Sequence, residues 1–289
     1  MESIKNDSLY QNHDFDTAFS TLYRVYKKNF WPLFLLSLAG TLIVYLFAFS
    51  LGPYQIPSEA IPDPGPGDIA HFLTLFSLIL VVGLLVYTFV YLAILYWVYS
   101  QQKDETRSAW SVFAEAARKY YFRFLLLVIL VSLIFIVGSV IGLLIFFIGI
   151  LLALAYLGVS LYVAGPALIV EDASPGDAIW RSFTLTHKDF WMSLGLVIVL
   201  FVITLVIQFV LMAIVSLPGA IVFISQVASE GGASVLLSPD ISSFWTSFGV
   251  IGIILNSLVS ALVMPLMPIF AMILYYRLRY KENETSQQG

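Results

Sequence analysis

One pattern of residues occurs three times along this chain, and it constrains the fold more than any other feature. The copies begin at Ala18, Ala109 and Ala178, and they align without a gap. They read AFSTLYRVYKKNFWPLF, AWSVFAEAARKYYFRFL and AIWRSFTLTHKDFWMSL. In each copy a small residue opens a stretch with helical spacing, and a pair of basic residues, a pair of aromatic residues and a long apolar run follow. His187 occupies one of the basic positions in the third copy. Three similar stretches predict three similar structural units.

Each copy is typical of a helix that lies on a membrane surface and leads into a spanning helix. Its cations suit the headgroup level, its aromatic residues suit the interface, and its apolar run suits the bilayer core. The composition agrees, because 60% of the residues are hydrophobic, 11% are charged and the mean hydropathy is +0.92. Soluble domains carry about 25% charged residues. The sequence therefore predicts a polytopic membrane protein, and its lack of cysteine excludes disulfides, thiolate catalysis and cysteine-based metal sites.

The chain contains enough apolar sequence for six membrane crossings of about 20 residues each. Four spans are predicted at residues 29–51, 69–99, 190–216 and 244–276, and the uncharged segment 124–170 supplies two more.

Turn and helix-breaking residues predict where these spans end. We expect a tight turn near Gly149 within the long uncharged segment, and an end to the fifth span at Pro218. Pro265 and Pro268 should kink the sixth span. Residues 1–13 are predicted to form a mobile tail and residues 282–289 a polar tail, and the arginine-rich sequence just before this tail is also expected to fray.

The repeated pattern organises these spans into three units within one membrane domain, residues 14–281. The units cover about residues 14–103, 104–172 and 173–281. Each comprises a cytoplasmic amphipathic helix on the membrane surface, an outward span and an inward span. Ser174, Pro175 and Asp177 supply a cap, a first-turn proline and a capping-box acid for the third surface helix. The predicted fold is an all-α bundle of six transmembrane helices, arranged as three parallel hairpin repeats about an axis along the membrane normal.

The distribution of basic residues predicts the orientation of the bundle. All 14 lysine and arginine residues lie outside the two loops predicted on the opposite side, residues 52–68 and 217–243. Because basic loops stay in the cytoplasm, both termini are expected to be cytoplasmic.

The third copy and the end of the chain carry a resemblance to a known family. The segment PALIVEDASPGDAIWRSFTLTHKDFWMSLG, which starts at Pro166, and the closing sequence LYYRLR, which starts at Leu274, resemble a family of bacterial membrane domains. These domains are fused to some glycerophosphodiester phosphodiesterases and also occur as stand-alone proteins. At Arg277 the family more often has an acidic residue. The resemblance implies a bacterial inner-membrane protein. In the fused proteins hydrolysis is carried out by a separate soluble barrel, so the resemblance does not imply hydrolytic activity for this chain.

The sequence offers no strong candidate for a catalytic, metal-binding or cofactor-binding site. The residues Glu171, Asp172, Asp177, His187 and Asp189 lie near one another in the sequence. An acid–base or metal role for them is conceivable, but capping and interfacial anchoring account for most of them. No zinc-protease helix, phosphate-binding glycine loop or nucleophile elbow is present. We therefore predict a protein that is not an enzyme and has no cofactor and no nucleic-acid partner.

Two functions remain open from the sequence. The first is a module that organises anionic lipid, or a membrane-protein partner, at the cytoplasmic leaflet. Its candidate headgroup-binding residues are Lys27, Lys28, Arg118, Lys119 and Lys188. The alternative is a transporter or channel for an uncharged or amphipathic solute, in which the membrane-embedded amides of Gln208 and Asn256 line a path. Both amides could instead form hydrogen bonds between helices, and Gly138 and Gly142 have the spacing of close helix packing.

Overall fold

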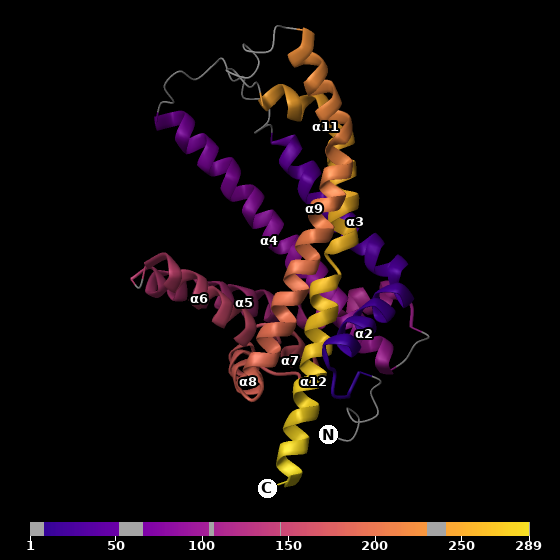
Figure 1. Cartoon of the computed structure of the whole chain (residues 1–289), viewed down its shortest axis with the longest axis vertical. Helices are drawn as coiled ribbons and strands as arrows, with labels where there is room; N and C mark the ends of the chain where they lie inside the picture. Colours follow the sequence, from indigo (N-terminus) through magenta and orange to yellow (C-terminus); the bar gives the residue numbers. More distant parts are fainter. Residues whose placement is uncertain (1–8, 52–65, 104–106, 145, 230–240, 289) are drawn as a thin grey trace. The chain divides into compact units, whose positions relative to one another are not determined.

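The computed structural model describes residues 9–51, 66–103, 107–144, 146–229 and 241–288 (Figure 1). Helices joined by short connections make up this part of the chain, which contains no strand. The helices are α2 (Phe15–Lys28), α3 (Phe30–Ser50), α4 (Pro66–Lys103), α5 (Ala109–Leu143), α6 (Phe146–Ser160), α7 (Ala164–Val170), α8 (Pro175–His187), α9 (Phe190–Ser229), α11 (Ile241–Val263) and α12 (Leu266–Gln288).

Six helical stretches of the described chain are long and apolar enough to cross a membrane. They are Phe30–Ser50, Ile69–Lys103, Ala109–Leu143, Ile148–Val170, Phe190–Leu217 and Gly252–Gln287. The protein is therefore an all-α multi-pass membrane protein, which confirms the predicted fold class.

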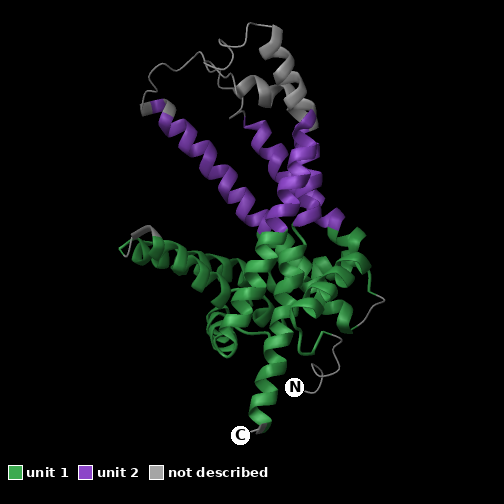
Figure 2. Cartoon of the chain, viewed as in Figure 1, with its two compact units in different colours: residues 1–33, 88–203, 264–289 green, residues 34–87, 204–263 purple. Residues whose placement is uncertain are grey.

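The helices form two compact units, which Figure 2 colours separately. Unit 1 comprises Met1–Leu33, Thr88–Ile203 and Met264–Gly289, and unit 2 comprises Phe34–Tyr87 and Thr204–Val263. Unit 1 contains the second and third copies of the repeated pattern and the first copy up to Leu33. Within unit 2, the Thr41 hydroxyl of α3 donates a hydrogen bond of 3.3 Å to the Ser257 carbonyl of α11. The predicted division into three repeat units stays a prediction.

Helix α12 is the central helix of unit 1. Every residue from Ile269 to Tyr276 is buried, and so is every residue from Leu92 to Val98 in α4. A helix that is apolar on all sides is stable only inside a protein core or a membrane. Helices α2, α7 and α8 all contact α12. The segment that gives unit 1 its core is therefore the last long helix of the chain.

Two helix ends differ from the sequence prediction. Helix α9 continues past Pro218 to Ser229, although its stretch suited to crossing a membrane ends at Leu217, close to the predicted end of the fifth span. Proline is tolerated within membrane helices, where neighbouring groups can satisfy the backbone carbonyl that it leaves free. The turn after the third span lies between Leu143 and Phe146, not near Gly149. The interruption predicted at Pro265 is confirmed, because α11 ends at Val263 and α12 begins at Leu266.

Both predicted tails are more ordered than expected where the structure describes them. Leu9 and His13 are buried, and the Nε of Arg277 donates a hydrogen bond of 2.7 Å to the backbone oxygen of His13. Helix α12 continues to Gln288, and its polar end includes the buried side chains of Arg277 and Arg279. Residues Leu9 and His13 are therefore packed into unit 1, and the chain after Tyr276 is helical, whereas the sequence suggested tails without such contacts. At the end of α12, Arg277 and Arg279 are ordered because they form ion pairs with carboxylates from other parts of the chain, Asp189 and Glu171.

Candidate functional site

The three copies of the repeated pattern share one arrangement of buried and exposed positions. Both basic positions are exposed in every copy. Three positions are buried in all copies: Leu22, Phe113 and Ser182; Val25, Ala116 and Leu185; Leu33, Phe124 and Ser193. The buried positions lie three, eight and eleven residues apart, which is the spacing of one helix face. Each copy therefore packs one face into unit 1 and presents its cations on another.

The second aromatic residue of each pair is exposed in all three copies. Trp31 is 67% exposed, and Phe122 and Trp191 are both 81% exposed. Trp110 and Trp180 are also exposed, at 82% and 75%. Large exposed aromatic rings beside cations are typical of the level where lipid headgroups meet acyl chains. This combination makes the copies the main candidate site for contact with lipid.

The second copy differs from the others in the residue that follows its basic pair. Asn29 and Asp189 occupy this position in the first and third copies, and both interrupt the helix. Tyr120 occupies it in the second copy, where α5 runs unbroken from Ala109 to Leu143. Short polar side chains compete for backbone hydrogen bonds, whereas tyrosine does not. The prediction of a separate second surface helix is therefore wrong.

The interruption in the first copy is stabilised by side-chain hydrogen bonds. The amide nitrogen of Asn29 donates to the Val25 carbonyl at 2.9 Å, and the Trp97 indole donates to the Asn29 oxygen at 3.0 Å. Asn29 is buried, so these bonds satisfy an amide that is removed from water.

All five predicted headgroup residues are exposed, and Lys27 lies 5.8 Å from the centre of the Tyr23 ring. Lys119 and Lys188 are also close to carboxylates of other segments. Lys119 lies 4.0 Å from Asp172, and Lys188 donates a hydrogen bond of 2.8 Å to Glu282. Lys188 is therefore less available to lipid than the sequence predicts.

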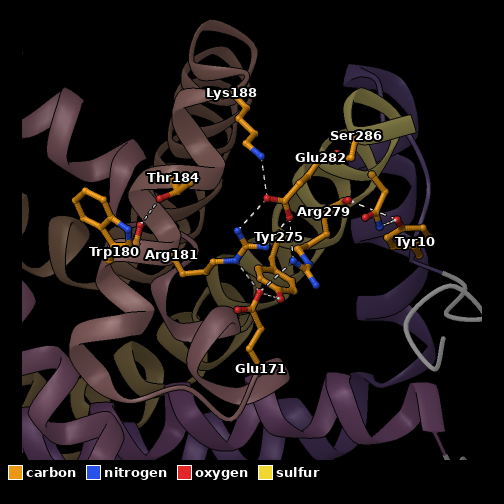
Figure 3. A network of polar contacts seen from close by, with 11 residues as sticks. Tyr10, Glu171, Trp180, Arg181, Thr184, Lys188, Tyr275, Arg279, Glu282 and Ser286 are labelled. Carbon is orange, nitrogen blue, oxygen red and sulfur yellow. Dashed lines mark hydrogen bonds and ion pairs between the residues drawn. The ribbon is translucent and has the colours of Figure 1, made fainter. Parts of the chain in front are cut away.

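Lys188 belongs to a cluster of charged residues around Glu282 on α12 (Figure 3). Arg181 of α8 donates to both oxygens of Glu282, at 3.0 Å and 2.5 Å, and Arg279 donates to one of them at 2.9 Å. The Glu282 side chain is only 16% exposed. Such charge-assisted bonds are stronger than neutral ones.

Glu171 is the second carboxylate of this cluster. It follows α7 and accepts hydrogen bonds from the Arg181 Nε at 2.9 Å and from the Tyr275 hydroxyl at 2.8 Å. Arg279 lies 3.6 Å away. Glu171, Glu282, Arg181, Arg279 and Lys188 thus join the chain after α7, helix α8 and the end of α12.

A second cluster surrounds Asp189, which follows α8. Its carboxylate accepts a hydrogen bond from Lys281 at 2.7 Å and pairs with Arg277 at 2.5 Å. Burial alone would raise the pKa of Asp189, but the bonds from Lys281 and Arg277 outweigh this effect and lower it. His13 lies beside Arg277, and burial lowers the pKa of its imidazole.

The remaining acidic and histidine candidates have structural contacts. Ser174 caps α8, because its hydroxyl accepts a bond of 3.2 Å from the Asp177 backbone and donates one of 2.6 Å to the Asp177 carboxylate. This confirms the predicted helix start. The ring nitrogens of His187 lie 2.8 Å from the Tyr156 hydroxyl and 2.7 Å from the Phe183 carbonyl. Asp172 pairs with Arg123 at 3.1 Å.

The two membrane-embedded amides belong to unit 2. Asn256 donates a hydrogen bond of 2.8 Å to the Gly252 carbonyl of its own helix, not to another helix as predicted. Gln208 is partly exposed. The amide of Asn256 is therefore used locally, which does not favour a solute path.

The charged clusters were missed as a site because their partners lie far apart in sequence. The whole of the third predicted repeat unit, residues 173–281, separates Glu171 from Glu282, and only the fold brings them both to Arg181. One signal was present in the sequence: Tyr275, Arg279 and Glu282 follow helical spacing, as do Arg277 and Lys281.

Comparison with protein-family models, curated proteins and solved structures finds no match to this chain. The resemblance to the membrane domains of glycerophosphodiester phosphodiesterases therefore stays an expectation from the sequence.

Proposed function

We propose that this protein is a non-enzymatic membrane module that binds anionic lipid at the cytoplasmic leaflet of a bacterial inner membrane. The observation that carries the proposal is the exposure of the basic pair and the outer aromatic residue in all three copies. The shared burial pattern also supports treating the copies as equivalent units of the family that the sequence resembles. A lipid so bound could be presented to a membrane-protein partner.

The expected strength of lipid binding follows from the exposed cations. A lysine or arginine near an anionic leaflet contributes about 1 kcal/mol, and the attraction decays within a Debye length. Lys27, Lys28, Arg118 and Lys119 together would contribute about 4 kcal/mol at most. Lys188 contributes less because it is already paired with Glu282.

Replacing Lys27, Lys28, Arg118 and Lys119 together with glutamine should remove most of the anionic lipid that co-purifies with the protein. Glutamine keeps the side-chain length and helix propensity but removes the charge. Lipid extracted from the purified protein and analysed by mass spectrometry measures the effect. Lys188→Gln is the control, because it should lower stability while most bound anionic lipid remains. An unchanged lipid content in the fourfold variant would contradict the proposal.

The proposed orientation can be tested because the chain contains no cysteine. Single cysteines at Ser58, Ser234 and Ser286 probe the predicted outer loops and the C-terminal end. Ser58 and Ser234 lie outside the described residues, and Ser286 is exposed on α12. In sealed cells a membrane-impermeant thiol reagent should label Cys at the first two positions and reach the third only after permeabilisation. Labelling of Ser286→Cys alone in sealed cells would show that the orientation is the opposite of the predicted one.

A further inference from the structure

Helix α5 exposes one continuous face from Arg118 to Val140. Successive exposed positions on this face lie one, three or four residues apart, and together they cover one side of the α-helix. They are Arg118, Lys119, Phe122, Arg123, Leu126, Ile129, Leu133, Ile136, Val137 and Val140. The opposite face contacts α6. A single surface of α5 is therefore cationic at its start and mainly apolar beyond Arg123, where the exposed Ser132 donates its hydroxyl hydrogen bond to the Val128 carbonyl of the same helix.

The cationic end of this face has an excess of positive charge. Arg118, Lys119 and Arg123 carry three charges, and Asp172 is the carboxylate that pairs with them in the described part of the chain, at 3.1 Å from Arg123 and 4.0 Å from Lys119. The carboxylate of Glu115 also interacts electrostatically with Lys119, but Glu115 forms an ion pair with Arg107, which neutralises its charge. Two positive charges are left for an anion. The side chains of Lys119, Arg123 and Asp172 are at least half exposed, and Arg118 is also exposed. An anion can therefore reach all three cations.

The apolar part of the face is at least as long as one lipid leaflet. A helix rises 1.5 Å per residue, so the ten steps from Arg123 to Leu133 span about 15 Å. Half of a bilayer hydrocarbon core of about 30 Å is the same length. Leu126, Ile129, Leu133 and Ile136 are between 41% and 60% exposed. An acyl chain can lie along them while its phosphate stays at the cations.

Only the second copy places both features on one helix. In the first and third copies, Asn29 and Asp189 separate the basic pair from the spanning helix. In α5 the unbroken backbone at Tyr120 keeps the cations in line with the apolar face. The loss of the helix interruption in this copy thus creates a surface that the other two lack.

The geometry points to a site on α5 for one anionic phospholipid, with its phosphate at Arg118, Lys119 and Arg123 and an acyl chain along Leu126, Ile129, Leu133 and Ile136. The site rests on the proposed lipid binding and assigns it to one helix. Arginine suits this role because its planar guanidinium can bind a phosphate through two parallel hydrogen bonds.

Asp172 competes with the phosphate for the same cations. Its backbone has a φ of 50°, in the left-handed region, where aspartate and asparagine are among the few residues found often apart from glycine. Asparagine can therefore replace it without backbone strain. Removing its charge should leave the fold intact, because a half-exposed ion pair contributes little to stability.

The test is a titration of the purified full-length protein with phosphatidylglycerol, read by native mass spectrometry. Arg118→Gln/Arg123→Gln should weaken binding about 25-fold, at roughly five-fold for each cation removed. Asp172→Asn should tighten it by up to about five-fold. Glycerol 3-phosphate, which has the phosphate but no acyl chain, should not displace the lipid at an equal concentration.

The matched control for charge is Lys27→Gln/Lys28→Gln, which removes the same charge from α2. Because the proposed function also gives Lys27 and Lys28 a share in lipid binding, this variant should weaken binding, but clearly less than Arg118→Gln/Arg123→Gln does. If this control loses the lipid and Arg118→Gln/Arg123→Gln does not, the α5 site is wrong and the general proposal survives. If neither variant loses affinity, both proposals fail. Displacement by glycerol 3-phosphate would show a site for free phosphate and overturn the role of the apolar face.

Discussion

Replacing Glu282 with glutamine should lower the free energy of unfolding by about 3 kcal/mol or more. Glu282 accepts hydrogen bonds from Arg181, Arg279 and Lys188, and its side chain is 16% exposed. Without its charge, Glu171 alone faces the three cations, so the net charge of the cluster rises from +1 to +2. Arg181 and Arg279 are 21% and 10% exposed, and a poorly solvated excess charge is costly. Chemical denaturation in detergent, followed by tryptophan fluorescence, measures the loss.

Two further variants separate this effect from a general loss of charge. Glu284→Gln removes the same charge from the same helix at an exposed position and should change stability by less than about 0.5 kcal/mol. Arg181→Met/Glu282→Met keeps the cluster at a net charge of +1, so it should be less destabilised than the sum of its single variants. Strictly additive losses would mean that Arg181 and Glu282 do not act as a pair.

The number and class of the helices were predictable because hydrophobic length is a local property. About 20 apolar residues without charge predict a span wherever they occur, and all six spans lie where the sequence placed them. Helix starts were predictable for the same reason, as the capping of α8 by Ser174 shows. A cap depends only on neighbouring residues, which a single sequence displays.

The end of α12 was not predictable from local composition. Its sequence is polar, and polar ends usually fray, yet the side chains of Arg277 and Arg279 are only 2% and 10% exposed. Their partners, Asp189, Glu171 and the backbone of His13, come from distant parts of the chain. Only the tertiary fold brings these groups together, so the sequence could show the helical spacing of the charges but not their pairing.

The unbroken helix α5 shows how one residue can change a repeated pattern. The three copies align without a gap, and this alignment suggested three separate surface helices. The decisive difference is the single position held by Asn29, Tyr120 or Asp189. The sequence interpretation relied on the similarity of the whole pattern and gave little weight to this position. Whether the helix is interrupted depends mainly on the residue found there.

Substitution of Gly142 by alanine should destabilise the α5–α6 hairpin by about 2 kcal/mol. A Cβ atom at Gly142 would lie 2.7 Å from the Gly149 oxygen and 2.9 Å from the Ile150 Cα. Both are backbone atoms, so the two helices would have to separate along their contact. Small residues permit such close backbone approach between membrane helices, which confirms the packing role predicted for this position. The gain of about 1 kcal/mol in helix propensity from glycine to alanine only partly offsets the cost.

Two other glycines of the same hairpin provide graded controls for this prediction. At Gly138 the added Cβ would meet the Leu157 Cδ1, the end of a flexible side chain that can move aside, so Gly138→Ala should cost less than Gly142→Ala. At Gly158 nothing lies within 4 Å, and alanine there should be neutral or stabilising. Thermal unfolding of the three variants in detergent should therefore give the order Gly158→Ala, Gly138→Ala, Gly142→Ala from most to least stable. Equal midpoints would mean that α5 and α6 do not touch at Gly142, and that the exposed face assigned to lipid on α5 is not fixed by its partner helix.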